Sequence, residues 1–225
     1  MSELRFPVIV INFKAYREVE GNHALSIAQA CQEVSERLGV CIVACPPMVE
    51  LSKVAAAVRI PVMAQHVDAK QPGSQTGWVT PEMVRSAGAI GTLINHSEHR
   101  LSQPEIASIA ATCRKVGLKI CVCADTAENS GIVATYKPDM VAVEPPELIG
   151  GDVSVTEARP EVVSDAVKAV KCIDATIPVL CGAGVKTGKD VKKAIELGAR
   201  GVLLASGVVK AKDPKKALED LVQYI

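Results

Sequence analysis

The stretch VIVINFKAYRE (8–18) decides the fold. Its first four residues, Val8 to Ile11, are all apolar and β-branched, and they show no alternation of apolar and polar side chains. A strand of this composition is covered on both faces, as is typical of parallel sheets. An open, doubly wound sheet usually carries G-x-G-x-x-G after its first strand, whereas this chain continues with Asn12-Phe13-Lys14. The stretch therefore favours a closed barrel.

Seven similar runs follow along the chain, and longer segments of helical period separate them. With the first run they predict eight strands: 8–13, 41–46, 62–67, 91–96, 119–124, 140–145, 178–183 and 201–206. The helical segments with the clearest signals are 23–39, 104–117, 159–174, 187–198 and 213–225. No Pro-, Gly- or Ser-rich linker divides the 225 residues. We therefore predict an α/β fold, a closed (β/α)8 barrel, as a single domain over 1–225, with a doubly wound open sheet as the alternative.

The bulk composition narrows the class of partner. Lys plus Arg and Asp plus Glu each number 25, so no basic excess points to nucleic acid or an anionic membrane. No apolar run approaches the length of a membrane span. The first residues, MSELRFPVIVINFK, lack the features of a signal peptide, so we expect a cytoplasmic protein.

The eight cysteines form no Cys-x-x-Cys pair, and most lie inside apolar runs. We interpret them as small buried hydrophobic residues in a reducing compartment. A metal site would need a cluster of Cys and His, and the four histidines offer only His96-x-x-His99. We therefore expect no metal.

Polar residues stand where several expected strands end, which is the face that carries the chemistry in such barrels. Glu144, between Val143 and Pro145, is a candidate general base, because partial desolvation raises the pKa of a carboxyl group. The alternative is a strand-end acid that points to water. Lys14 needs a charge partner in a barrel mouth, either a substrate anion or Glu98, unless it turns out to solvent.

His96 is followed by Ser97, where a helical turn would aim its positive end back at the imidazole and keep the ring neutral. A neutral imidazole can donate a hydrogen bond to a developing oxyanion, although a core histidine satisfied by backbone is the alternative. The turns CGAG (181–184) and LASG (204–207) follow the seventh and eighth strands, where barrels usually bind phosphate. Tight turns that need small residues explain them equally well.

Three motifs together resemble the triosephosphate isomerase family, in its short archaeal form: Asn12-Phe13-Lys14, NHSEHR (95–100) and EPPELIGG (144–151). Each falls on the strand where that family carries it, and the resemblance covers essentially the whole chain. The stretch 65–83 is also similar to the long third loop of the family. The resemblance implies reversible interconversion of dihydroxyacetone phosphate and D-glyceraldehyde 3-phosphate through an enediolate, in glycolysis and gluconeogenesis, without metal or organic cofactor.

The resemblance also implies roles for individual residues. Glu144 would move the proton between C1 and C2, His96 would act as the electrophile, and Lys14 with Asn12 would stabilise negative charge. Glu98 would pair with Lys14. Backbone amides would hold the phosphate at Ile149, Gly150, Gly184, Ala205 and Ser206. Thr76 and Gly77 on the third loop would reach the site of a neighbouring subunit in a homotetramer, a dimer of dimers.

The segment after Glu144 would form a lid. Pro145 and Pro146 would fix the leading hinge, residues 147–149 would move as a unit, and Gly150 with Gly151 would provide the trailing hinge.

This chain departs from the family at three positions. Asp152 places a negative charge close to the expected phosphate. His99 stands where relatives usually carry arginine, which puts the ion pairs of the fourth loop in doubt. Gly184 stands where the longer forms carry serine, so only a backbone donor is left there.

Two other functions are kept open. A pentose-phosphate epimerase would share the phosphate-binding barrel, but it mostly carries further acids and histidines, often for a metal. A catalytically dead barrel would bind sugar phosphates or a protein partner, but it would have lost its base or its lysine, and this chain has both.

Overall fold

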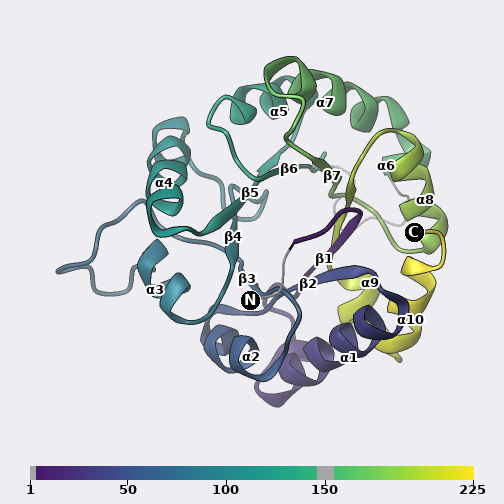
Figure 1. Ribbon diagram of the computed structural model, residues 1–225, viewed down its shortest axis with the longest axis horizontal. Helices are drawn as coiled ribbons and strands as arrows, with labels where there is room; N and C mark the ends of the chain where they lie inside the picture. The colour runs from purple at the N-terminus through teal and green to yellow at the C-terminus, as the bar shows by residue number, and fades with distance from the viewer. Residues whose placement is uncertain (1–3, 146–154) are drawn as a thin grey trace.

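The computed structural model describes residues 4–145 and 155–225. Eight parallel strands lie side by side in the order β2-β1-β8-β7-β6-β5-β4-β3, and helices surround them (Figure 1). The strands are β1 Val8–Asn12, β2 Cys41–Cys45, β3 Met63–Ala64, β4 Gly91–Ile94, β5 Lys119–Ala124, β6 Met140–Val143, β7 Val179–Cys181 and β8 Gly201–Leu204. All eight expected strands are therefore present; β5 has the expected bounds, and the other seven are shorter than their apolar runs.

The sheet closes on itself between β2 and β3. A parallel bridge joins Ala44 to Val62, and the Ala44 amide donates to the Pro61 carbonyl at 3.1 Å. This contact confirms the closed (β/α)8 barrel and rules out the doubly wound open sheet. It is brief because β3 has only two residues, so the strand expected over 62–67 ends early and the chain leaves into the third loop.

The five clearest helical segments all form helices: α1 Asn22–Leu38, α4 Gln103–Val116, α7 Pro160–Ile173, α8 Gly188–Glu196 and α10 Pro214–Val222. Local signals set their ends. Ser102 and Glu105 form a capping box at the start of α4, and Gly117 takes φ 70° at its end. Shorter elements complete the ring: η1 Arg17–Val19, η2 Met48–Glu50, α2 Leu51–Ala57, α3 Pro81–Ser86, α5 Ala127–Ala134, α6 Val155–Ala158 and α9 Ser206–Val209.

The core has two parts because each strand is covered on both faces. The outer part lies between strands and helices, and the inner part fills the barrel with side chains such as Val10, Leu93, Cys121 and Leu203. All eight cysteines are unpaired and seven are buried, Cys172 being the exposed one. The cysteines thus behave as small hydrophobic side chains.

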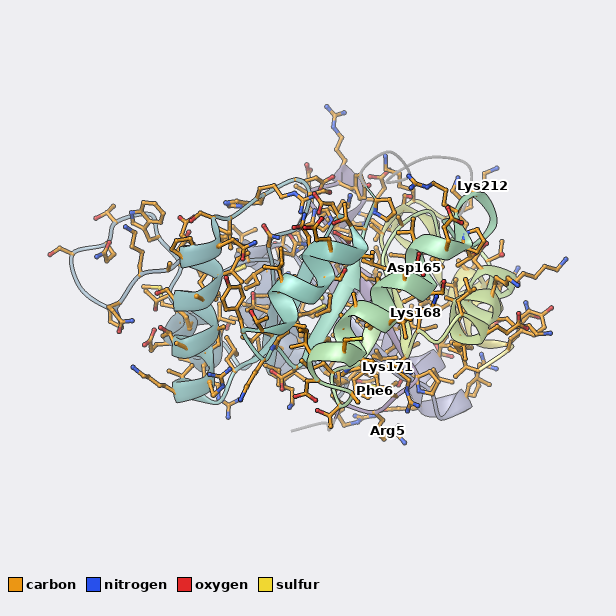
Figure 2. The ribbon with its side chains drawn as sticks, turned by 90° about the horizontal axis from the view of Figure 1, so that it is seen from above. Arg5, Phe6, Asp165, Lys168, Lys171 and Lys212 are labelled. Atoms are coloured by element: carbon orange, nitrogen blue, oxygen red, sulfur yellow. The ribbon has the colours of Figure 1, made fainter. Side chains whose placement is uncertain are left out.

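The two ends of the barrel differ. Figure 2 shows Arg5 and Phe6 at one end, where the chain enters β1, and Lys212 towards the other. Phe6 packs against the inner core.

The third loop, between β3 and α3, extends away from the barrel (Figure 1), and Trp78 on it is 47% exposed. Among the described residues, no helix is long and apolar enough to cross a membrane.

Candidate functional site

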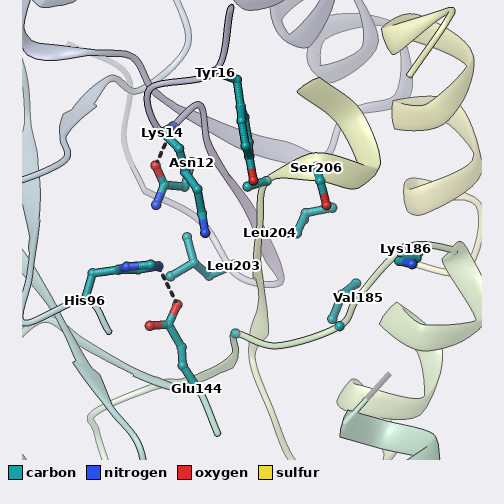
Figure 3. Close-up of a pocket in the computed structure, with 13 residues that line it drawn as sticks. Asn12, Lys14, Tyr16, His96, Glu144, Val185, Lys186, Leu203, Leu204 and Ser206 are labelled. Carbon is teal, nitrogen blue, oxygen red and sulfur yellow. Dashed lines mark hydrogen bonds and ion pairs between the residues drawn. The ribbon is translucent and has the colours of Figure 1, made fainter. Parts of the chain in front are cut away.

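A pocket opens at the carboxyl ends of the strands, and Figure 3 shows the side chains around it. The empty space between its walls, which includes open solvent, is about 490 Å³. Seven of the residues predicted from the sequence line it: Asn12, Lys14, His96, Glu144, Gly184, Ala205 and Ser206. Parallel strands deliver their ends to one face, so residues as far apart as Asn12 and Ser206 meet here because of the fold and not because of sequence proximity.

Lys14 is held in the pocket by its backbone and its charge. It takes a left-handed conformation with φ 52°, which is costly for a residue with a side chain. Two bonds stabilise it: the Lys14 amide donates to Asn12 Oδ1 at 3.0 Å, and Gln65 Nε2 donates to the Lys14 carbonyl at 3.0 Å. The Lys14 ammonium pairs with Glu98 Oε1 at 2.7 Å. Because the Glu98 side chain is 57% exposed, the pair neutralises Lys14 only partly.

His96 is neutral, and its proton is on Nε2. The Glu98 amide donates to Nδ1 at 3.2 Å, so Nδ1 is an acceptor and the hydrogen is on the other nitrogen. Burial, followed by the positive charge of Lys14, lowers the pKa of His96 to about 4. A single turn starts at Ser97, closed by the bond from the His99 amide to the His96 carbonyl, and its Glu98 amide points at the imidazole. It does not continue into a helix, since α4 begins only at Gln103. A single backbone amide does what a helix end was expected to do.

Glu144 directly follows β6, and its amide donates to the Ala124 carbonyl at 2.7 Å. The side chain is 2% exposed, and Oε1 lies 3.5 Å from His96 Nε2. Within residues 4–145 and 155–225, Oε2 has no hydrogen-bond partner. Burial raises the pKa of Glu144 to about 7, against the opposing effects of the Cys123 thiol and the Lys14 charge. The carboxyl group is thus partly ionised near neutral pH, as suits a general base.

Gly182 makes room for that carboxyl group. A Cβ atom at this position would lie 2.4 Å from Glu144 Cγ and 3.1 Å from Oε1. Real Cβ atoms do not approach other atoms so closely, so any larger residue would displace the base. The sequence shows Gly182 only as part of a small-residue turn, and nothing in the sequence signals this contact.

The fourth loop, between β4 and α4, is held in place by groups other than an arginine at position 99. The His99 ring stacks on His66 at 3.9 Å between centroids, and His66 Nε2 lies 3.1 Å from Asp68 Oδ1. Asn95, with φ 58°, donates to the Cys123 carbonyl and accepts from the Leu101 amide. Stacking, backbone bonds and an ion pair between Arg100 and Asp125 at 3.4 Å thus support the loop without an arginine at position 99.

The right-hand wall of the pocket in Figure 3 consists of short turns. Gly184 takes φ 68°, a left-handed conformation that favours glycine. Ala205 precedes α9, whose first amides have no carbonyl within the helix to bond. These amides and the Lys14 ammonium together suit an oxyanion.

Two groups of predicted residues lie elsewhere. Thr76 is exposed on the third loop, outside the pocket of its own chain. Ile149 and Gly150 lie outside the described residues, as do Asp152 and the expected lid over 146–151. Among the described residues, no three His, Cys, Asp or Glu side chains are placed to hold a metal ion.

Comparison with known proteins agrees with the geometry. The family model described as "Triosephosphate isomerase" matches residues 7–225. The chain is 49% identical over 216 residues to the triosephosphate isomerase of Methanothermus fervidus, covering 96% of this chain and 97% of the relative. It is 48% identical over 218 residues to that of Methanocaldococcus jannaschii, covering 97% and 100%. The crystal structure of triosephosphate isomerase from Bartonella henselae has the same fold, with a TM-score of 0.74 and 21% identity over 96% of this chain and 98% of that one.

Proposed function

The chain belongs to the triosephosphate isomerase family, and we propose that Glu144, His96 and Lys14 perform its reaction. The reaction interconverts dihydroxyacetone phosphate and D-glyceraldehyde 3-phosphate, a step of glycolysis and gluconeogenesis. The observation that carries this assignment is the contact between Glu144 Oε1 and His96 Nε2 in a pocket that Lys14 also lines. A base, a neutral hydrogen-bond donor and a cation thereby surround the same small volume.

Each group has a defined task. Glu144 removes a proton from C1 of dihydroxyacetone phosphate and returns it to C2. At the same time the oxygen on C1 loses its hydroxyl proton and the oxygen on C2 gains one, so no atom is gained or lost overall. The His96 Nε2–H donates to the carbonyl oxygen as negative charge develops there, and Lys14 and Asn12 stabilise that charge. A neutral imidazole suits this step, because it can give a proton to the substrate oxygen and take it back.

The phosphate end of the substrate is assigned to backbone amides. Gly184, Ala205 and Ser206 support this, because they line the side of the pocket formed by β7, β8 and α9. Ile149 and Gly150 are proposed to complete it.

A coupled assay with glyceraldehyde 3-phosphate, run with and without a chelator, tests the function. We expect isomerisation that the chelator leaves unchanged. Activity lost with the chelator would favour an epimerase-like barrel, and binding of a triose-phosphate analogue without turnover would favour a dead barrel. The same assay on Asp152→Gly measures how much activity the negative charge of Asp152 costs.

Replacing Gly182 by alanine should misplace the base. The new Cβ must displace Glu144 Cγ from 2.4 Å, and a displacement of about 1 Å can cost about 10²-fold in rate. We expect kcat to fall by about 10- to 100-fold with KM nearly unchanged, measured by the same assay. Gly131→Ala is the matched control, because its Cβ would meet Ala169 at an ordinary 3.5 Å. Equal kcat in the two variants would contradict the steric role of Gly182.

The activity should depend on pH through Glu144. Only the ionised carboxylate can accept a proton, and its pKa is raised to about 7. Activity is therefore full above this pH, and kcat/KM should fall about tenfold per pH unit below it, with a further break near pH 6 from the substrate phosphate. His96, with its pKa lowered to about 4, stays neutral throughout. A kcat/KM that stays constant from pH 8 to pH 5 would contradict the assignment of the base.

We also propose a cytoplasmic homotetramer built from single-domain subunits, as a dimer of dimers. Exposed apolar side chains on separate elements support it: Val49 (90% exposed) on η2, Trp78 (47%) on the third loop and Ile132 (39%) on α5. Thr76 would then reach a neighbouring pocket. Light scattering on the wild type and on Ile132→Glu tests this. We expect a tetramer that becomes a dimer, and a monomeric wild type would overturn it.

A further inference from the structure

Tyr16 lines the same pocket as Lys14 and Ser206, and no motif drew attention to it. It stands between β1 and η1 and is half-buried. In Figure 3 its ring runs along the pocket and its hydroxyl points towards the segment of Leu204 and Ser206. That segment forms the wall assigned above to the phosphate.

The hydroxyl of Tyr16 is available to a ligand. Across residues 4–145 and 155–225 it makes no hydrogen bond, whereas the hydroxyl of Tyr136 donates to Gln103 Oε1 at 2.9 Å. A phenol at the edge of a polar pocket can donate one hydrogen bond without losing another, so binding an anion there costs little reorganisation.

Lys210 fixes the ring of Tyr16. Its ammonium lies 4.3 Å from the ring centroid, within the range of a cation–π contact. Lys210 directly follows α9, and its amide donates to the Ser206 carbonyl. The contact thus joins the loop that carries Lys14 to the short helix that begins at Ser206.

We propose that Tyr16 is a further substrate-binding residue, whose hydroxyl donates to the phosphate of the substrate, and that Lys210 positions it. The proposal rests on the function assigned above. Hydrogen bonds from a neutral donor to a charged group are stronger than those between neutral groups. The hydroxyl recognises the phosphate in substrate, product and intermediate alike, so its effect falls on binding and not on the chemical step.

The test uses Tyr16→Phe, which removes only the hydroxyl. We expect KM for glyceraldehyde 3-phosphate and the inhibition constant of inorganic phosphate to rise together, by about tenfold, with kcat within about twofold. Tyr224→Phe is the matched control, because Lys192 lies 5.7 Å from its ring centroid outside the pocket. Lys210→Met should raise both constants less, and the double variant should not exceed Tyr16→Phe by the full product.

Two results would overturn the proposal. One is an unchanged inhibition constant for phosphate in Tyr16→Phe. The other is a fall in kcat at constant KM, which would place the hydroxyl at the reacting carbons. Direct titration of wild type and Tyr16→Phe with inorganic phosphate needs no turnover. It therefore separates a failure of this proposal from a failure of the isomerase assignment.

Discussion

Replacing Glu144 by aspartate should abolish most of the turnover while substrate still binds. The substitution keeps the carboxylate but withdraws it by one methylene, about 1.5 Å. Because the base must lie within hydrogen-bond distance of the proton that it removes, we expect kcat to fall by about 10²- to 10³-fold, with KM within a few-fold of the wild type. Steady-state kinetics in the coupled assay measure both constants.

Glu128→Asp is the matched control for that experiment. Glu128 is an exposed acid in the first turn of α5, outside the pocket, so the same loss of a methylene should leave both constants unchanged. Near-normal turnover in Glu144→Asp would remove Glu144 from the role of the base, whatever the control shows.

Replacing Lys14 by methionine should weaken both binding and turnover. The methionine keeps most of the apolar stem and removes the cation that faces the substrate. Loss of one group that stabilises developing charge typically costs about 10²- to 10³-fold in kcat. Substrate also carries a dianionic phosphate, so KM should rise by about tenfold or more as well.

The fold should survive this change. Both bonds that stabilise the left-handed backbone at position 14 involve main-chain atoms of Lys14, so they persist. Glu98, 57% exposed, loses its partner but stays solvated. Lys53→Met is the matched control, since Lys53 pairs with Glu50 at 3.5 Å on the surface. An unchanged KM in Lys14→Met would contradict a direct contact between Lys14 and the substrate.

The sequence predicted the barrel because its signals are local and repeated. Apolar runs such as 8–13 and 140–145 carry no alternation, and segments such as 104–117 carry a helical period. The strand ends that hold Asn12, Lys14, His96 and Glu144 follow from that pattern, since parallel strands must place their ends on one face. The motifs NFK and NHSEHR then indicated the family.

What the sequence missed depends on contacts between segments far apart. The clash that reserves Gly182 for glycine involves a side chain 38 positions away. The stack of His99 on His66, which supports a loop that lacks an arginine at position 99, joins side chains 33 positions apart. The turn expected at Ser97 is present, but the bond from its Glu98 amide to the imidazole could not be read from the sequence. Such details arise from packing, on which local sequence has little influence.

The central claim is that Glu144 moves the proton of the substrate. Dihydroxyacetone phosphate is incubated in D2O with wild type or with Glu144→Gln, and proton NMR follows the loss of the C1 hydrogen signal. We predict rapid exchange with the wild type and exchange at least about 10²-fold slower with Glu144→Gln, although the variant still binds inorganic phosphate. Exchange at the wild-type rate in Glu144→Gln would contradict the claim.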